Sequence, residues 1–201
     1  MRLKIADGEI ARAHATLERG ALFLGQGLGR DDGVPRAIAG RYRAKVIGNG
    51  LRELDRFLLL LVRALAVAHG TALPDREHNT ANMVGRLRQA LGVANPDRAR
   101  LLALGRTRDC LFHCGGLVRR GDARNGGVMT IGWHGAGGGA LLRVAIGEFL
   151  DPSADELFDI CLYYRTLAAR LLSEASVATP LARSIPETRS SPDPAYATGA
   201  R

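Results

Sequence analysis

Apolar residues recur at helical spacing along most of this chain. The clearest stripe alternates steps of four and three residues and consists of Ile47, Leu51, Leu54, Leu58, Leu61, Leu65 and Ala68. Such spacing is typical of the buried seam of a long helix in a bundle. Charged residues of the same segment, including Arg52, Glu53 and Arg56, lie off this seam. The pattern therefore predicts a long amphipathic helix over 47–68.

Further helices are predicted on both sides of this segment. An apolar stripe over 9–28 predicts a helix that ends where the Gly- and Pro-containing stretch GQGLGRDDGVP begins. Beyond the connector HGTALPDREHN, apolar residues spaced by four predict a third helix over 83–91. A fourth helix follows, for which Asn95 is the predicted N-cap and Pro96 the first helical residue.

The pattern changes after the fourth helix. Residues 121–139 are rich in glycine, and the segments VMTIGW and ALLRVAI on either side of HGAGGG predict a small β-hairpin. Trp133 lies at its edge and is expected either to pack onto the helices or to contact a base. Ser153 and Glu156 have the spacing of a capping box, which predicts the start of a last helix.

Together these elements predict an all-α fold, an antiparallel four- to five-helix bundle with a small β-hairpin before the last helix. The chain has 201 residues, of which 46% are hydrophobic, enough to bury one sizeable core. A single domain is therefore predicted over 1–176. The remaining residues, 177–201, contain mostly Ser, Pro, Thr and Ala among few large apolar groups and predict a disordered tail.

The charge and the cysteine content indicate the type of binding partner and the cellular compartment. The chain carries 28 Lys+Arg against 20 Asp+Glu, a formal net charge of +8, which favours an anionic partner, with nucleic acid as the leading class. An arginine-rich composition is also common in proteins from GC-rich genomes. Three cysteines without a disulfide framework favour a reducing compartment. The longest apolar run, 57–62, is too short for a membrane span, and no signal-peptide pattern is present, so a cytoplasmic protein is expected.

The densest group of chemically active residues lies in RTRDCLFHCGG, residues 106–116. On a helix, Arg106, Asp109 and His113 share nearly one face. Arg108 lies about 140° around the helix from His113, so the two do not stack on each other within one chain. Both would line a groove where this helix meets a second copy of itself.

This combination of side chains suits the cleavage of RNA without a metal. A histidine titrates near neutral pH and can take a proton from the 2′-hydroxyl or return one to the leaving oxygen. An arginine can hold the scissile phosphate and stabilise the charge that develops on it. Two copies of His113 across a two-fold axis would supply the acid and the base, and Asp109 would orient the imidazole.

The motif R-D-x-x-x-H, formed by Arg108, Asp109 and His113, resembles the signature of the HEPN superfamily. The resemblance implies a small helical bundle that dimerises so that two motifs face each other. It also implies a metal-independent endoribonuclease that needs no cofactor, in a toxin–antitoxin or phage-defence system, with an antitoxin protein as a possible partner. Members paired with a nucleotidyltransferase antitoxin carry a tyrosine two residues after the histidine, where this chain has Gly115.

Several alternatives stay open at the level of sequence. Arg106 also has a permitted spacing to His113 and competes with Arg108 as the functional arginine. Arg106 and Asp109 have the spacing of a surface ion pair. Residues 98–124 contain seven arginines against two aspartates, and there Arg106, Arg119 and Arg120 are the candidate RNA-binding residues.

Three further interpretations compete with the ribonuclease. Cys110, His113 and Cys114 lie within about one helical turn, but a closed zinc site needs a fourth ligand, such as Cys161 or His134, and no metal is expected. A bundle with the same motif can instead bind RNA, a nucleotide or a protein without cleaving. A helical interaction protein with a coincidental motif would bury His113 and turn Arg108 away from any cleft.

Overall fold

The computed structural model describes residues 2–29, 34–74, 77, 79–124, 126–135 and 139–178, with side chains from residue 7 onward. The predicted disordered tail lies outside these residues from 179 onward. Over the described ranges the chain forms five helices and two strands, which are α1 (Arg2–Gly25), α2 (Arg43–Ala68), α3 (Thr80–Ala90), α4 (Arg98–Cys114), β1 (Val128–His134), β2 (Leu141–Ala145) and α5 (Ala154–Val177).

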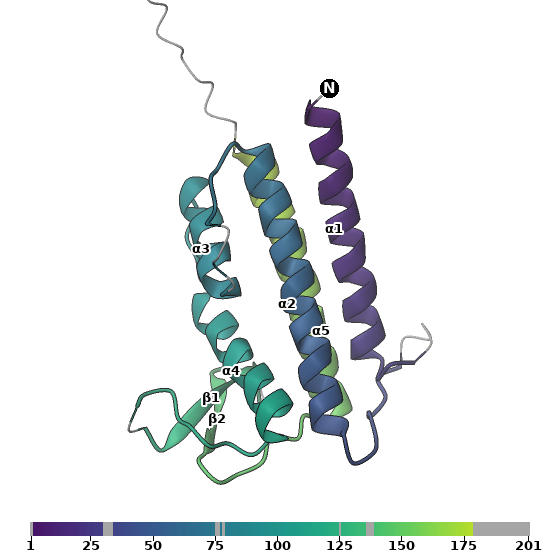
Figure 1. Cartoon of the computed structure of the whole chain (residues 1–201), viewed down its shortest axis with the longest axis vertical. Coiled ribbons are helices and arrows are strands. Elements are labelled where there is room, and N and C mark those ends of the chain that lie inside the picture. The colour runs from purple at the N-terminus through teal and green to yellow at the C-terminus, as the bar shows by residue number, and fades with distance from the viewer. Residues whose placement is uncertain are drawn as a thin grey trace, which may run out of the picture.

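The helices form an antiparallel bundle of four columns (Figure 1). α1, α2 and α5 are the long columns, and α3 and α4 follow each other as the fourth. The β1–β2 hairpin lies at the end of the bundle where α4 ends. The predicted helical bundle with a small hairpin before the last helix is confirmed. None of the helices in the described ranges has the length and apolarity to cross a membrane.

The predicted seam of α2 forms the centre of the core. Six of its seven residues are at most 2% exposed, namely Ile47, Leu51, Leu54, Leu58, Leu61 and Leu65. They pack between α1, α4 and α5. Ala68 is the exception, because it lies in the last turn of α2 beside the C-cap His69 and is exposed. The four–three spacing therefore located the buried face correctly except in its final turn.

The first helix is shifted from its predicted range of 9–28. It begins at Arg2 and ends at Gly25. Gly27 and Leu28 have φ angles of 69° and 64°, in the left-handed region, so the helix cannot continue through them. A Cβ atom at Gly27 would lie 2.1 Å from the carbonyl oxygen of Arg36. This turn therefore requires a glycine for space as well as for conformation.

The prediction of Asn95 as the N-cap of the fourth helix is wrong. α4 begins at Arg98 and its N-cap is Asp97. The side chain of Asn95 instead accepts a hydrogen bond of 3.1 Å from Arg88 Nη1. Asp97 makes no side-chain cap either, because its carboxylate accepts hydrogen bonds from Arg88 Nη1 at 2.6 Å and from the Tyr163 hydroxyl at 3.2 Å. A tertiary ionic contact here replaces the local cap.

Arg88 is the centre of a buried ionic cluster that joins α3, α4 and α5. It is 1% exposed, and its Nε and Nη2 donate to Glu174 at 2.8 and 2.9 Å while Nη1 donates to Asp97. Arg170 Nη2 donates to the same aspartate at 2.8 Å. Burial alone would raise the pKa of Asp97, but the hydrogen bonds from the two guanidinium groups hold that pKa below its ordinary value.

The capping box predicted at the start of the last helix is confirmed, and the helix before the hairpin has a glycine as its C-cap. α4 ends at Cys114, and its C-cap Gly115 has a left-handed φ of 61°. α5 begins with a complete capping box, in which the Ser153 hydroxyl accepts from the Glu156 backbone N–H and the Glu156 carboxylate accepts from the Ser153 N–H. Between them β1 and β2 pair antiparallel, with Val128 opposite Ala145 and a register shift between Thr130 and His134.

The hairpin is fixed to the bundle through β1. Trp133 is 3% exposed and its Nε1 donates a 2.9 Å hydrogen bond to Glu156, so this side chain packs onto the helices. The Gly132 N–H donates to the Thr107 hydroxyl at 3.2 Å, and Arg100 Nε donates to the Gly132 carbonyl at 3.1 Å. Thr107 and Arg100 belong to α4, so the hairpin packs directly against the helix that carries the motif.

Candidate functional site

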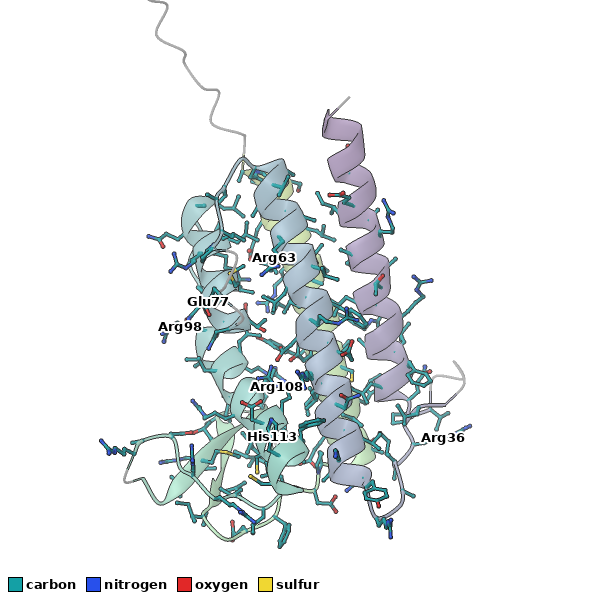
Figure 2. All side chains as sticks on the ribbon, viewed as in Figure 1. Arg36, Arg63, Glu77, Arg98, Arg108 and His113 are labelled. Carbon is teal, nitrogen blue, oxygen red and sulfur yellow. The ribbon has the colours of Figure 1, made fainter. Side chains whose placement is uncertain are left out.

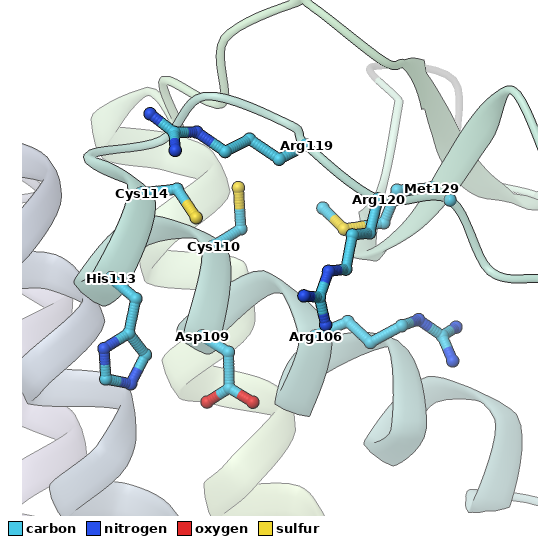
Figure 3. A pocket seen from close by; sticks show the side chains of 9 residues that line it. Arg106, Asp109, Cys110, His113, Cys114, Arg119, Arg120 and Met129 are labelled. Carbon is cyan, nitrogen blue, oxygen red and sulfur yellow. The ribbon is translucent and has the colours of Figure 1, made fainter. Parts of the chain in front are cut away.

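The predicted site residues gather on the C-terminal half of α4. Figure 2 shows Arg108 and His113 on this part of the helix. His113 is exposed, and the Asp109 side chain is 58% exposed. Figure 3 shows both side chains leaving α4 on the same side. Asp109 and His113 thus form an exposed ridge, called here the α4 ridge.

Two hollows flank the α4 ridge. The hairpin groove has a volume of about 550 Å³ and is lined, besides the ridge residues, by Arg106, Cys110, Cys114, Arg119, Arg120, Gly121 and Met129. The α2 groove has a volume of about 610 Å³ and is lined, besides the ridge residues, by Asn49, Arg52, Glu53, Asp55, Arg56, Leu59, Arg108 and Phe112. Among the lining residues, Asp109 and His113 alone border both grooves.

Arg108 lies in the α2 groove between two carboxylates. Its Nη1 donates to Asp55 of α2, and its Nε donates to Asp109 at 2.9 Å. Asp55 is 5% exposed and also accepts a 2.7 Å hydrogen bond from the Tyr164 hydroxyl of α5. Burial raises the pKa of Asp55, which the Arg108 guanidinium opposes. Burial alone would lower the pKa of Arg108, but the two carboxylates raise it, so the guanidinium stays charged.

Arg106 lies on the other side, in the hairpin groove. Its Nε is 3.0 Å from a carboxylate oxygen of Asp122, which also accepts the backbone N–H of Thr130 at 3.0 Å. The predicted surface pair between Arg106 and Asp109 is therefore not formed. Asp109 pairs with its neighbour Arg108 instead, because Asp122 from the segment before β1 reaches Arg106. Of the two grooves, Arg106 therefore borders the hairpin groove and Arg108 the α2 groove, while both also line a smaller hollow of about 170 Å³ beside Asp109.

Arg119 and Arg120 complete the rim of the hairpin groove (Figure 3). Both are exposed and lie just after α4. The backbone beside them is fixed by pairing with the segment after β2, since the Val118 N–H donates to the Glu148 carbonyl and the Leu150 N–H donates to the Gly116 carbonyl, each at 2.9 Å. The three arginines predicted to bind RNA therefore line one groove, next to the α4 ridge.

α2 contributes positive charge to the site, which the sequence pattern did not predict. The ring of Phe112 meets the His113 ring edge to face, with 4.9 Å between the centroids. Lys45 Nζ lies 5.5 Å from the centroid of the Phe112 ring, and the Arg52 guanidinium carbon lies 5.7 Å from it. These cations bring positive charge to the side of the site that faces α2. The sequence pattern places Arg52 off the hydrophobic seam of α2, but it does not predict that Arg52 lies near Phe112 of α4.

Gly48 allows α4 to approach α2 at this point. A Cβ atom at Gly48 would lie 2.7 Å from the backbone nitrogen of Phe112. We expect Gly48→Ala to push the end of α4 away from α2 and to lower the free energy of unfolding by about 1–3 kcal/mol. Gly105→Ala is the matched control, because a Cβ atom there meets nothing within 4 Å and the change should stabilise α4 by up to about 1 kcal/mol.

Urea denaturation followed by circular dichroism measures both changes. If Gly48→Ala proved as stable as the wild type, the two helices would not be in contact through this glycine.

The cysteines of the site behave as packing groups. Cys110 is buried, its thiol lies 3.3 Å from the Leu117 carbonyl oxygen, and burial raises the pKa of this thiol to about 11. Cys161 is buried on α5, close to Gly25 of α1. No group of three or more His, Cys, Asp or Glu side chains within the described part of the chain is arranged to hold a metal ion.

The site can supply proton transfer and phosphate binding in one place. His113 provides an exposed imidazole, and Arg108 provides a charged guanidinium in the adjoining groove. Asp109 lies between them in the sequence of α4. Arg106, Arg119 and Arg120 of the hairpin groove add positive charge. These groups suit an anionic substrate with an acidic hydroxyl or a labile oxygen. No protein-family model, curated protein or solved structure matches the chain.

Proposed function

We propose that this protein is a metal-independent endoribonuclease of the HEPN type, which leaves 2′,3′-cyclic phosphate and 5′-hydroxyl ends. One observation carries the proposal. The exposed His113 stands on a ridge between two grooves, with Arg108 in one groove and Arg106, Arg119 and Arg120 in the other. A phosphate that crossed the ridge would meet the imidazole and an arginine together.

Each residue has a defined part in this reaction. His113 moves a proton between the 2′-hydroxyl or the leaving 5′-oxygen and solvent. Arg108 binds the scissile phosphate and stabilises the negative charge of the transition state. Asp109 positions His113, and the arginines of the hairpin groove bind neighbouring phosphates, with the salt dependence of such contacts.

A homodimer belongs to the proposal, because one histidine cannot supply acid and base at the same instant. A second copy would bring its own His113 to the same phosphate, and the exposed ridge leaves room for this approach. The setting that fits such an enzyme is a cytoplasmic toxin–antitoxin or phage-defence system, in which an antitoxin protein holds the nuclease inactive.

The direct test is cleavage of a labelled, structured RNA by the purified chain in EDTA. We expect cleavage at unchanged rate when the chelator is added, and products that phosphatase cannot dephosphorylate until acid opens their cyclic ends. Loss of cleavage in EDTA, or products with 5′-phosphate ends, would contradict the proposed chemistry.

A second function is favoured by one specific observation. The Arg108 guanidinium is already held by the carboxylates of Asp55 and Asp109, which leaves it less free to grip a phosphate. A non-catalytic module that binds RNA through Arg106, Arg119 and Arg120 would need no free Arg108. Salt-sensitive binding of RNA without any turnover would identify this module.

The two candidate arginines are expected to differ in their kinetic effects. Arg108→Lys keeps a positive charge beside Asp55 but loses the bidentate geometry, so kcat should fall by about tenfold to a hundredfold. Arg106→Ala should raise KM severalfold and leave kcat nearly unchanged, because this side chain binds away from the scissile phosphate. Steady-state cleavage of a fluorogenic RNA measures both constants, and the reverse pattern would make Arg106 the functional arginine.

A further inference from the structure

The guanidinium of Arg108 has two edges, and each faces a different carboxylate. Nη1 donates to Asp55, whereas Nε and Nη2 both lie 2.9 Å from the same oxygen of Asp109. An arginine edge with two parallel N–H groups is the geometry that binds phosphate or carboxylate oxygens strongly. In the free protein that edge is filled by the chain's own residue.

The contact with Asp55 is buried and costly to break. Asp55 is 5% exposed, and its second oxygen accepts the hydroxyl of Tyr164, which is 1% exposed. Separating Arg108 from Asp55 would leave a buried, unpaired charge, which is strongly unfavourable. Arg108 is therefore anchored in the α2 groove at one edge.

The contact with Asp109 is exchangeable. The Asp109 side chain is 58% exposed and belongs to the residue next to Arg108 in the chain. Exposed ion pairs contribute little free energy and are screened by salt. Nothing in the described surroundings of Asp109 holds its carboxylate besides Arg108. An incoming oxyanion can therefore take its place at low cost.

We propose that Asp109 occupies the position on Arg108 that the RNA phosphate takes, and that the phosphate displaces it. The inference rests on the proposed function. The released carboxylate lies one helical turn before His113 on the α4 ridge, where it can orient the imidazole. Asp109 is thus a positioning residue that exchanges partners: it holds Arg108 before RNA binds and His113 afterwards.

Partner exchange predicts that Asp109→Asn acts on binding and turnover in opposite directions. The neutral amide competes less well for Arg108, so an RNA phosphate should bind about two- to fivefold more tightly, the range that one exposed ion pair supplies. The same change removes the carboxylate that orients His113, so kcat should fall, by at most the roughly 10⁴-fold that the equivalent change costs in a buried acid–base triad. KM and kcat should therefore decrease together, which a merely structural residue would not produce.

The measurement of binding uses a short fluorescent RNA with 2′-O-methyl groups, which cannot be cleaved. Fluorescence anisotropy at low salt gives its affinity for the wild type, for Asp109→Asn and for Asp159→Asn. Asp159 is an exposed carboxylate on α5 that borders neither groove, so its variant controls for the change in net charge. The gain should be confined to Asp109→Asn and should disappear in the double variant Arg108→Lys/Asp109→Asn.

The outcomes separate the two proposals. Equal tightening by Asp159→Asn, or a gain that persists with Arg108→Lys, overturns the partner exchange alone, provided that the wild type cleaves RNA. A wild type that neither binds the methylated RNA nor cleaves an unmodified one overturns the proposed function and this inference with it. Unchanged thermal stability of Asp109→Asn is expected, because its side chain is exposed.

Discussion

Replacing His113 by alanine should lower kcat for RNA cleavage by about 10² to 10⁴-fold, the usual contribution of a general acid or base. The reason is that the α4 ridge of one chain offers no second imidazole to take its place. KM should change little, because in the proposed mechanism the arginines of the two grooves, and not His113, bind the phosphates. Initial rates of cleavage of a fluorogenic RNA in EDTA, at several RNA concentrations, measure both constants.

The fold should tolerate this replacement. His113 is exposed, and among the described residues its ring contacts only the edge of Phe112, so the free energy of unfolding should stay within about 0.5 kcal/mol of the wild type. His69→Ala, at the far end of α2, is the matched control and should cleave at the normal rate. Full activity of His113→Ala would remove the histidine from the mechanism and with it the HEPN-type proposal.

Arg88→Ala should produce the largest loss of stability, about 3–5 kcal/mol in the free energy of unfolding. The side chain is 1% exposed and donates to Asp97 and Glu174. Without it, Glu174 loses the guanidinium that pairs with it, and Asp97 keeps the hydrogen bonds from Arg170 and Tyr163 alone. Urea unfolding followed by circular dichroism, with the m-value checked for constancy, measures the change.

Arg86→Ala is the control for this experiment. Arg86 lies on the same helix two residues earlier but is exposed, so its removal should change stability by less than about 0.5 kcal/mol. A similar small effect for both variants would mean that the desolvation of Arg88 cancels its ion pairs. In that case Arg88→Met should be at least as stable as the wild type, because an apolar side chain of similar size would replace an ion pair that makes no net contribution to stability.

The helices were predictable because each depends on a local signal. The four–three spacing of α2, the capping box at Ser153 and the left-handed Gly115 all act within a few residues of the chain. The N-cap of α4 was not predictable in this way. Asn95 has a suitable side chain for a cap, but this side chain accepts a hydrogen bond from Arg88 instead. No local sequence pattern predicts that tertiary contact.

The placement of the three motif residues on one helix was predictable, but the ion pairs that they form were not. The motif placed Arg108, Asp109 and His113 on one helix, and the structure keeps them at neighbouring grooves. The partner of Arg108 is Asp55, which lies 53 residues earlier in the chain. One feature of the sequence points to this partner in retrospect. Asp55 directly follows the seam residue Leu54, so a charged side chain lies beside the buried face of α2 and needs a partner there.

The two adjacent tyrosines of α5 have a consequence for how the candidate site is supported. Neighbouring residues on a helix point about 100° apart, so the Tyr163 hydroxyl reaches Asp97 at the start of α4 while the Tyr164 hydroxyl reaches Asp55 beside Arg108. A rotation of α5, or a slide by one residue, would break both hydrogen bonds at once. The two phenol groups therefore connect α5 both to the residue before α4 and to the α2 carboxylate that holds Arg108, so one helix outside the two grooves supports the α2 groove from behind.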